Sequence, residues 1–303
     1  MMPQGPAPSA KGASRLPPLW AESAGEGESA TVGAARPVVN DASFRRPSRG
    51  AQLVYMKDLL RELVVRDMKI RYEGTALGFA WMLAKPLLFV GVFFFVFQVV
   101  LALDTPRFTS FSFIGILVYT WFQSALGDAS FVAFSNRELV RRPQFRVAVL
   151  PLVAVMTNMV HFLLSLPVLT VVLLLGGSEP SVALLALPLV VLIQFLLTAG
   201  LAYLTAAASV LFRDIGHLLN VVLTAFFFVC PIFYGADRVP AEFQAIYRLN
   251  PLVALLESYR NPLLHGLPPD WGSLMTVAAV AVLLAAVGYT VFERARHRFV
   301  EEL

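Results

Sequence analysis

The chain alternates between long apolar runs and short polar connections. Six runs are each close to the ~20 residues that a helix needs to cross a bilayer. They cover residues 86–103, 111–131, 147–175, 182–211, 218–234 and 273–292. A helix satisfies all of its backbone polar groups within one segment, as a lipid environment demands. The pattern therefore predicts an all-α membrane protein with six transmembrane helices.

Residues 51–73 show a different pattern, in which charged positions interrupt a three- and four-residue apolar spacing. The apolar positions are Leu53, Met56, Leu60, Leu63 and Val64, and the charged positions beside them are Arg61, Glu62, Arg66 and Lys69. This spacing is typical of an amphipathic helix. Because a membrane run follows, we expect an interfacial helix on the bilayer surface, with basic side chains toward phosphates. The alternative is a helix packed on a soluble domain, but no soluble core lies nearby in the sequence.

Two further segments fall outside the apolar runs. Residues 1–50 are rich in Pro, Gly, Ala and Ser, a composition typical of a disordered tail. We expect this tail to be cytoplasmic and to precede a membrane domain at 51–303. Residues 250–266, NPLVALLESYRNPLLHG, are apolar with helical spacing but too short and too charged to span. They predict a re-entrant or surface helix on the outer side, before the last span.

The distribution of charge fixes the expected orientation. The chain is 57% hydrophobic and 15% charged, with a net charge of +4 that could suggest nucleic acid. However, all but four of its 24 Lys and Arg residues lie on one side of the predicted topology, the exceptions being Arg107, Arg238, Arg248 and Arg260. The positive-inside rule places that side, with both termini, in the cytoplasm. The positive charge is therefore a topology signal, and we expect no nucleic-acid partner.

Several classes of chemistry find no support. The chain has no G-x-x-x-x-G-K-[ST] motif, so we expect no ATPase activity of its own. Its single cysteine, Cys230, rules out a multi-cysteine metal site, and we expect neither metal nor cofactor in this chain. Its carboxylates show no spacing suited to acid–base catalysis, so an enzyme is not expected. His161, within the third run, is a candidate functional group, but a neutral histidine that bonds a neighbouring helix is the favoured interpretation.

Two connections on the cytoplasmic side carry charge. One is SNRELVRRPQF, residues 135–145, and the other is LFRDIGHLLN, residues 211–220. A short charged helix between two spans could dock into a cleft of a soluble partner, but its arginines could also merely fix topology. The pair Arg213 and Asp214 separates two apolar runs, and such a pair needs a partner: each other, a neighbouring helix or a second protein.

Aromatic residues cluster in and beside the spans. Those that we single out are Trp81, Phe93, Tyr119, Trp121, Phe122 and Tyr234. Aromatic faces can stack on sugar rings, and a carbohydrate conduit would use them. Lipid contact and interfacial anchoring explain the same residues without a ligand.

The order of these motifs resembles the membrane subunit of ABC-2-type polysaccharide exporters, a family that includes permeases for O-antigen, capsule and teichoic acid. The resemblance rests on four motifs that occur in the family's order: RDMKIRYEGTALGFAWMLAKPLL, SNRELVRRPQF, LFRDIGHLL and NPLVALLESYRNPLLHG. Together these motifs extend the resemblance over residues 51–303. One departure is Pro143-Gln144-Phe145, where the family more often has an aromatic residue followed by proline.

The resemblance implies a homodimer in the bacterial inner membrane, paired with two copies of a separate ATPase that binds ATP and Mg²⁺. It implies that a lipid-linked or long-chain polysaccharide passes from the cytoplasm through a conduit lined by the aromatic residues above. The residues expected to couple to the ATPase are Arg137, Glu138, Arg141, Arg142, Arg213 and Asp214. Those expected at the lipid-carrier entry are Arg66, Lys69, Arg71 and Lys85, although simple attraction to membrane lipids would explain them too. Those expected at the exit gate are Glu257, Tyr259 and Arg260.

Three other functions compete with polysaccharide export. The first is an ABC-2 permease for a drug or a small lipid. The second is a membrane enzyme acting on polyprenyl-linked sugars, for which the sequence shows no catalytic cluster. The third is a structural anchor, which the charged inner loops make less attractive.

Overall fold

The computed structural model describes residues 49–73, 80–100, 107–142, 145–212 and 214–302 of the chain. Pro47–Leu303 form one compact unit, and this unit contains all of the described residues. Within them the chain is helical, without a β-strand. All but the last two residues of the predicted tail, 1–50, lie outside the described part.

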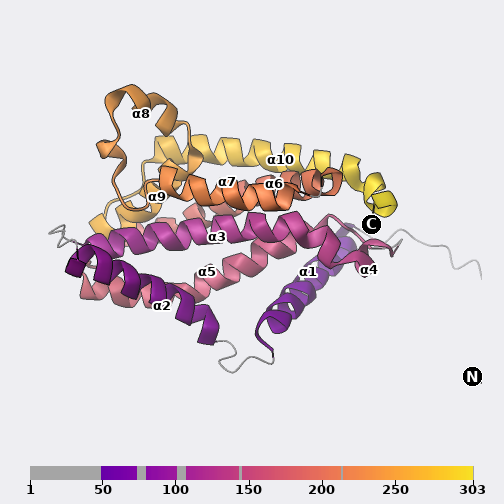
Figure 1. Ribbon diagram of the computed structural model, residues 1–303, viewed down its shortest axis with the longest axis horizontal. Coiled ribbons are helices and arrows are strands. Elements are labelled where there is room, and N and C mark those ends of the chain that lie inside the picture. The colour runs from indigo at the N-terminus through magenta and orange to yellow at the C-terminus, as the bar shows by residue number, and fades with distance from the viewer. Residues whose placement is uncertain (1–48, 74–79, 101–106, 143–144, 213, 303) are drawn as a thin grey trace, which may run out of the picture. The chain divides into compact units, whose positions relative to one another are not determined.

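The helices follow one another with short connections (Figure 1). The longer ones are α1 (Arg49–Tyr72), α2 (Ala80–Phe94), α3 (Phe108–Ser135), α5 (Val149–Leu175), α6 (Leu187–Leu211), α7 (Ile215–Val229) and α10 (Trp271–Glu302). The shorter ones are η1 (Phe95–Val100), α4 (Arg137–Val140), η2 (Val182–Ala186), η3 (Ala236–Arg238), α8 (Ala241–Arg248), α9 (Pro251–Arg260) and η4 (Asn261–His265).

Among the described residues, three helical segments are long and apolar enough to cross a membrane. They are Val149–Leu175, Val182–Leu211 and Trp271–Ala295. The helix α3 is equally long, but its polar residues, among them Gln123 and Asp128, lower its hydropathy. The helix α7 is apolar but has only 15 residues, because the helix ends before Cys230 and Pro231. The count of six spans therefore stays a prediction, while the all-helical fold is confirmed for the described residues.

The core forms around α3, which packs against α5 and α6, while α6 packs along α10. Figure 1 shows these helices running side by side. The larger buried cluster contains the aromatic residues Tyr119, Trp121 and Tyr259. A second cluster lies where α1 approaches α5, and it includes Phe145 and Phe292. We call this end of the bundle, near α4, the α4 end, and the opposite end the α8 end.

The helices α6 and α10 approach each other at two glycines. A Cβ atom added to Gly200 would lie 2.6 Å from the backbone of Leu284 and Ala285. A Cβ atom added to Gly288 would collide with the carbonyl oxygen of Gly200. Small residues at such contacts allow two helix backbones to pack closely in a membrane. This close approach explains why α6 and α10 form the most extensive helix pair of the fold.

The helix α1 packs on the rest of the unit. Leu63 and Val64 are buried in the second cluster against α5. Other apolar side chains of the same helix are exposed: Val54, Tyr55, Val65 and Ile70. The apolar residues are thus spread around α1 and do not form one stripe. The helix is confirmed, but its amphipathic, interfacial character stays a prediction.

Candidate functional site

A cavity of about 520 Å³ lies between α2, α3, α5 and α7. Polar side chains enter it from two facing helices. From α3 come Thr120, Gln123 and Ser124, and from α5 come Asn158, His161 and Ser165. Positions three and four apart share one face of a helix, so each helix presents a polar stripe to the cavity. A span whose polar residues share one face needs something polar on that side.

The remaining walls of the cavity are mainly aromatic and aliphatic. Trp81 and Phe89 contribute from α2, and Trp121 and Phe162 contribute from α3 and α5. The rings of Trp121 and Phe162 are stacked, with 5.1 Å between their centroids. A largely apolar pocket with a few convergent polar groups is the usual form of a small-molecule binding site. The cavity is therefore our candidate functional site.

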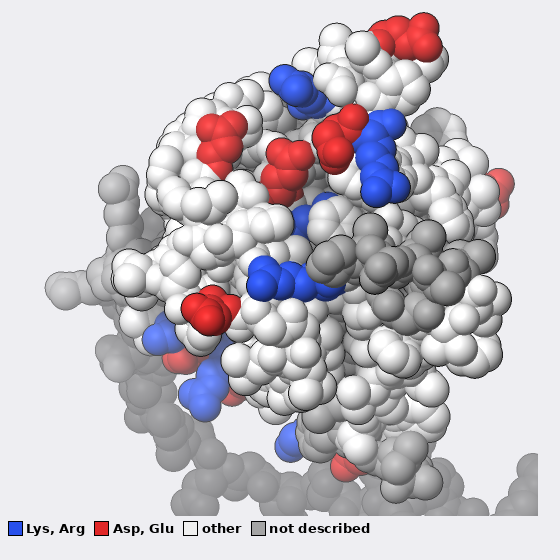
Figure 2. Space-filling model, turned by 90° about the vertical axis from the view of Figure 1, so that its left-hand side faces the viewer, with Lys and Arg blue, Asp and Glu red and all other residues white. Residues whose placement is uncertain are grey.

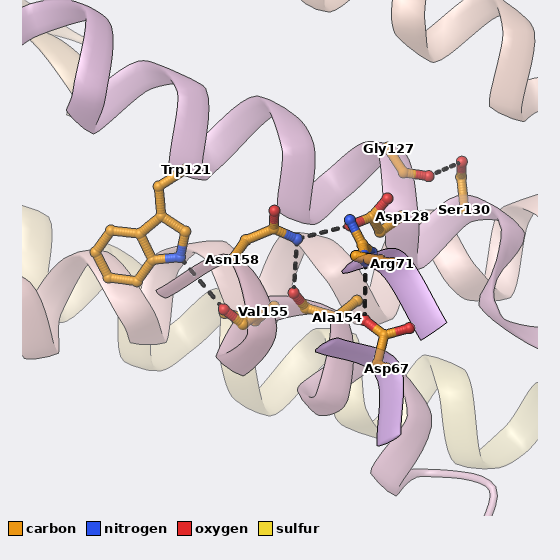
Figure 3. Close-up of polar contacts among 9 residues, drawn as sticks. All are labelled: Asp67, Arg71, Trp121, Gly127, Asp128, Ser130, Ala154, Val155 and Asn158. Atoms are coloured by element: carbon orange, nitrogen blue, oxygen red, sulfur yellow. Dashed lines mark hydrogen bonds and ion pairs between the residues drawn. The ribbon is translucent and has the colours of Figure 1, made fainter. Parts of the chain in front are cut away.

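A polar network lies at the cavity wall beside α1 (Figure 3). Arg71 Nη2 donates to Asp128 Oδ2 at 2.6 Å, and Asn158 Nδ2 donates to the same oxygen at 2.7 Å. Arg71 Nε also pairs with Asp67 Oδ2 at 3.2 Å. Asn158 Nδ2 bonds the Ala154 carbonyl of its own helix as well. The network thus joins α1, α3 and α5, and it holds the guanidinium of Arg71 at the cavity wall.

This network does not carry a net positive charge. Burial acts to lower the pKa of Arg71, but the charges and hydrogen bonds of Asp128 and Asp67 outweigh it and raise the pKa above its ordinary value. Arg71 therefore stays protonated at any physiological pH. Because two carboxylates face one guanidinium, the cluster carries a net negative charge when all three are ionised. Such a cluster repels phosphate instead of attracting it.

Only part of the predicted lipid-carrier entry meets at the cavity. Arg71 lines it, whereas Arg66 Nη2 donates to Asn136 Oδ1 at 2.6 Å, just before α4. Lys69 is exposed on α1 and shares a surface groove with Arg66. The side chain of Lys85 lies outside the described residues.

The residues predicted to couple to an ATPase lie at the α4 end. Arg137, Glu138, Arg141 and Arg142 are exposed in and just after α4. The guanidinium of Arg137 lies 5.9 Å from the centre of the Phe134 ring. Asp214 is exposed directly before α7, and Arg213 lies outside the described residues. The described members of this set therefore present charge to solvent and not to the core.

The predicted conduit aromatics separate into three groups. Trp81 and Trp121 line the cavity. Tyr119 and Phe122 are buried in the main core, where the Tyr119 hydroxyl donates to the Leu223 carbonyl oxygen. Tyr234 lies toward the α8 end and donates to the Val229 carbonyl oxygen at 2.7 Å. The side chain of Phe93 lies outside the described residues.

The predicted exit-gate residues lie on α9, and the structure divides them by burial. Glu257 is exposed, while Tyr259 and Arg260 are only 2% and 4% exposed. The Tyr259 hydroxyl donates to Gln194 Oε1 at 2.7 Å, which ties α9 to α6. Figure 2 views the α8 end, where acidic and basic side chains are interspersed on an otherwise uncharged surface.

Sequence reasoning missed the stripe formed by Thr120, Gln123 and Ser124. Their spacing of three and four residues within an otherwise apolar run was the available signal. It also did not identify the partner of Asp128, which is Arg71 in the structure. The partners lie 57 residues apart in sequence, so no local pattern joins them.

A double-mutant cycle tests the network. We expect Arg71→Ala and Asp128→Ala to be coupled by about 1 kcal/mol in unfolding free energy, because about a third of each side chain is exposed and solvent weakens the pair. Asp67→Ala is the control: it removes only the i,i+4 pair, which contributes about 0.3–0.5 kcal/mol. The free energies of unfolding of the three single variants and of the Arg71/Asp128 double variant are measured by denaturant unfolding of the purified protein. Strictly additive losses for Arg71 and Asp128 would contradict the network.

Comparison with known proteins gives a consistent set of relatives. Residues 58–264 match the family described as ABC-2 type transporter. The O-antigen export system permease protein RfbA of Myxococcus xanthus is 35% identical over 254 residues, which are 83% of this chain and 98% of that protein.

Two other relatives extend the comparison. A permease of the same name from Klebsiella pneumoniae is 30% identical over 252 residues, which are 83% of this chain and 97% of that protein. The polysialic acid transport protein KpsM of Escherichia coli is 19% identical over 241 residues, which are 78% of this chain and 93% of that protein. These alignments extend over almost the whole length of each relative.

Proposed function

This chain belongs to the ABC-2 type transporter family, and we propose that it is the permease subunit of an exporter that moves a polysaccharide across the bacterial inner membrane. One observation carries the proposal: alignments at 30–35% identity over 97–98% of permeases named for O-antigen export. The family and the apolar helices make it a multi-pass membrane protein of a bacterial membrane. The substrate class follows from the relatives' names.

The remaining parts of the proposal concern assembly and orientation. Two copies of this chain, each with six spans and an interfacial α1, work with two copies of a separate ATPase that binds ATP and Mg²⁺. The α4 end faces the cytoplasm, because basic residues gather in the connections there. The glycan starts from a lipid-linked form in the inner leaflet, with Arg66 and Lys69 at headgroup level. The α8 end then forms the exit, which Glu257, Tyr259 and Arg260 help to shape.

Deletion of the gene in its native host tests this function. We expect loss of the surface polysaccharide and accumulation of lipid-linked glycan inside the cell, both restored by a plasmid copy. Glycan on the surface and inside the cell is measured by gel electrophoresis of separated fractions. Hypersensitivity to a drug, with normal surface glycan, would instead establish the drug or lipid permease.

The exposed arginines after α4 provide a test of coupling. We expect Arg141→Glu with Arg142→Glu to lower export about tenfold or more, because like charges facing each other across an interface cost several kcal/mol. ATP hydrolysis by the purified complex continues without transport, and membrane insertion is retained. The matched control reverses two exposed arginines at the α8 end, Arg238→Glu with Arg248→Glu. Unchanged export in the Arg141/Arg142 variant would remove both residues from the coupling role.

A further inference from the structure

Two polar contacts tie the helix α1 to the end of α3. Arg66 Nη2 donates to Asn136 Oδ1 at 2.6 Å, and Arg71 Nη2 donates to Asp128 Oδ2 at the same distance. The residue numbers rise along α1 and fall from Asn136 to Asp128, so the two segments run antiparallel. The arginines are separated by a helical rise of only about 7.5 Å. A helix segment this short is rigid, so the two contacts cannot move independently.

Asn136 lies at the junction of α3 and α4, where it ends the first helix and precedes the second. Its Nδ2 donates to the Val132 carbonyl oxygen at 3.0 Å, so Oδ1 is the atom that accepts from Arg66. Its own carbonyl oxygen accepts from the N–H groups of Leu139 and Val140, at 3.0 and 3.1 Å. A movement of α4 therefore moves Asn136, and with it the acceptor of Arg66.

Apolar contacts join the same segments. Val140 of α4 is 3% exposed and belongs to the buried cluster that also contains Leu63 and Val64 of α1. The charged side chains in and just after α4 are exposed. A force on these exposed side chains thus reaches α1 by two routes, through the buried cluster and through Asn136.

Between the two polar contacts, α1 does not pack fully against the bundle. A cavity of about 130 Å³ lies there, and its walls from α1, α3 and α5 include Leu63, Phe131 and Leu150. Both arginines and both of their acceptors also line this cavity. Close-packed side chains resist relative movement because it costs them their dispersion contacts, and a gap lowers that resistance. The polar contacts therefore determine where this part of α1 lies relative to α3.

A cation on α1 could also act simply by attracting anionic lipid headgroups. Arg61 provides the comparison, because it is exposed on the same helix and lines the same surface groove as Arg66. Among the described residues, the Arg61 guanidinium has no hydrogen-bond or ion-pair partner, whereas that of Arg66 bonds Asn136. Headgroup attraction would affect both arginines alike. A function of the contact with Asn136 would distinguish them.

We propose that Arg66 and Asn136 are positioning residues that join α4 to α1, so that a displacement of α4 also moves the pair formed by Arg71 and Asp128. The inference rests on the proposed export function, in which an ATPase acts on α4. Neither residue needs to touch the glycan. The movement reaches α5 as well, because Asn158 donates to the same carboxylate oxygen of Asp128.

Export and ATP hydrolysis, measured on the same variants, test this linkage. In cells that lack the native gene, we expect Arg66→Ala to export about fivefold less glycan, the effect of losing one exposed hydrogen bond to a charged group. ATP hydrolysis by the purified permease–ATPase complex continues at the wild-type rate. Asn136→Ala has the same effect on export, and the double variant loses no more than either single one. The matched control, Arg61→Ala, exports as the wild type does, and immunoblots of membranes check the amount of each variant.

A chemical cross-link tests whether the connection itself matters. Arg66→Cys with Asn136→Cys removes the hydrogen bond, and a bis-maleimide about as long as an arginine side chain reconnects α1 with α4. The complex is reconstituted in liposomes with the lipid-linked glycan that the deletion strain accumulates. We expect the cross-link to raise transport per ATP hydrolysed about fivefold. N-ethylmaleimide, which caps both thiols without joining them, has no such effect.

Two features make the cross-link comparison independent of folding. One variant is measured with and without the link, so a difference in stability between variants does not enter. The native thiol, Cys230, is 0% exposed, and treatment of the wild-type complex controls for any reaction there.

The outcomes separate the two proposals. If Arg66→Ala and Arg61→Ala lower export equally, or if the cross-link does not raise transport, the linkage is wrong and the export function stands. Additive losses for the Arg66 and Asn136 substitutions would also contradict the linkage. If deletion of the gene leaves surface glycan unchanged, the export function itself fails.

Discussion

Replacement of Arg260 by alanine is expected to destabilise the protein by about 2–4 kcal/mol, because it leaves buried carbonyl acceptors without a charged donor and removes a large buried side chain. Arg260 is 4% exposed, and its guanidinium lies 3.4 Å from the centre of the Phe111 ring. Its Nη2 donates to the carbonyl oxygens of Ile232 and Phe111, at 3.1 and 3.3 Å. Alanine would leave both carbonyls without this donor and open a void beneath α9.

Two comparisons make this prediction specific. Arg260→Lys is expected to restore little of the loss, because an ammonium cannot stack on Phe111 as a planar guanidinium does. Arg248→Ala, at an exposed position on α8, is the control and is expected to change stability by no more than about 0.5 kcal/mol. Urea unfolding of the purified protein gives the free energies. Equal effects of the Arg260 and Arg248 substitutions would show that burial of Arg260 contributes nothing.

Substitution of Gly288 by alanine is expected to be the other severe change, with a loss of about 3 kcal/mol. A Cβ atom at this position would collide with the backbone carbonyl of Gly200, and a helix backbone cannot move aside as a flexible side chain can. The matched control is Gly91→Ala on α2, where an added Cβ meets nothing within 4 Å. That substitution should instead stabilise the protein by about 0.5–1 kcal/mol, the usual gain from replacing glycine within a helix.

The opposite signs of the two glycine substitutions are the measurable result. Both change one hydrogen to a methyl group within a helix, so intrinsic helix propensity affects them alike. Thermal unfolding in detergent, monitored by size-exclusion chromatography, ranks the variants by stability. A stabilised Gly288→Ala would mean that α6 and α10 do not touch at this point.

The two arginines at the α8 end show how tertiary structure reassigns a charged residue. The family resemblance placed Arg260 at an exit gate. In the structure it is buried and holds α9 against α3. Arg107 acts similarly, since it donates to the carbonyl oxygens of Leu264 and Gly177, both at 2.9 Å. Both residues thus fasten the segment around α9 and η4, so a gate role for Arg260 would require these contacts to break.

The sequence by itself determined the helical fold and the places where charge can gather. Helix formation follows from apolar runs whose length and composition are local properties, and Val182–Leu211 begins and ends as the sequence pattern predicted. The exposed arginines around α4 followed from their position in a short polar connection between two apolar runs. The resemblance of ordered motifs likewise led to the family to which the chain belongs.

Only the tertiary structure decided which face of each helix meets which neighbour. A membrane helix is apolar on nearly every side, so hydropathy does not distinguish the buried Tyr119 from Trp81, which lines the cavity. Contacts between distant residues, such as Arg71 with Asp128 and Gly200 with Gly288, depend on how the helices cross. The polar positions on α3 were present in the sequence as a local spacing, but sequence reasoning missed them. Helix packing brought those positions together into a cavity.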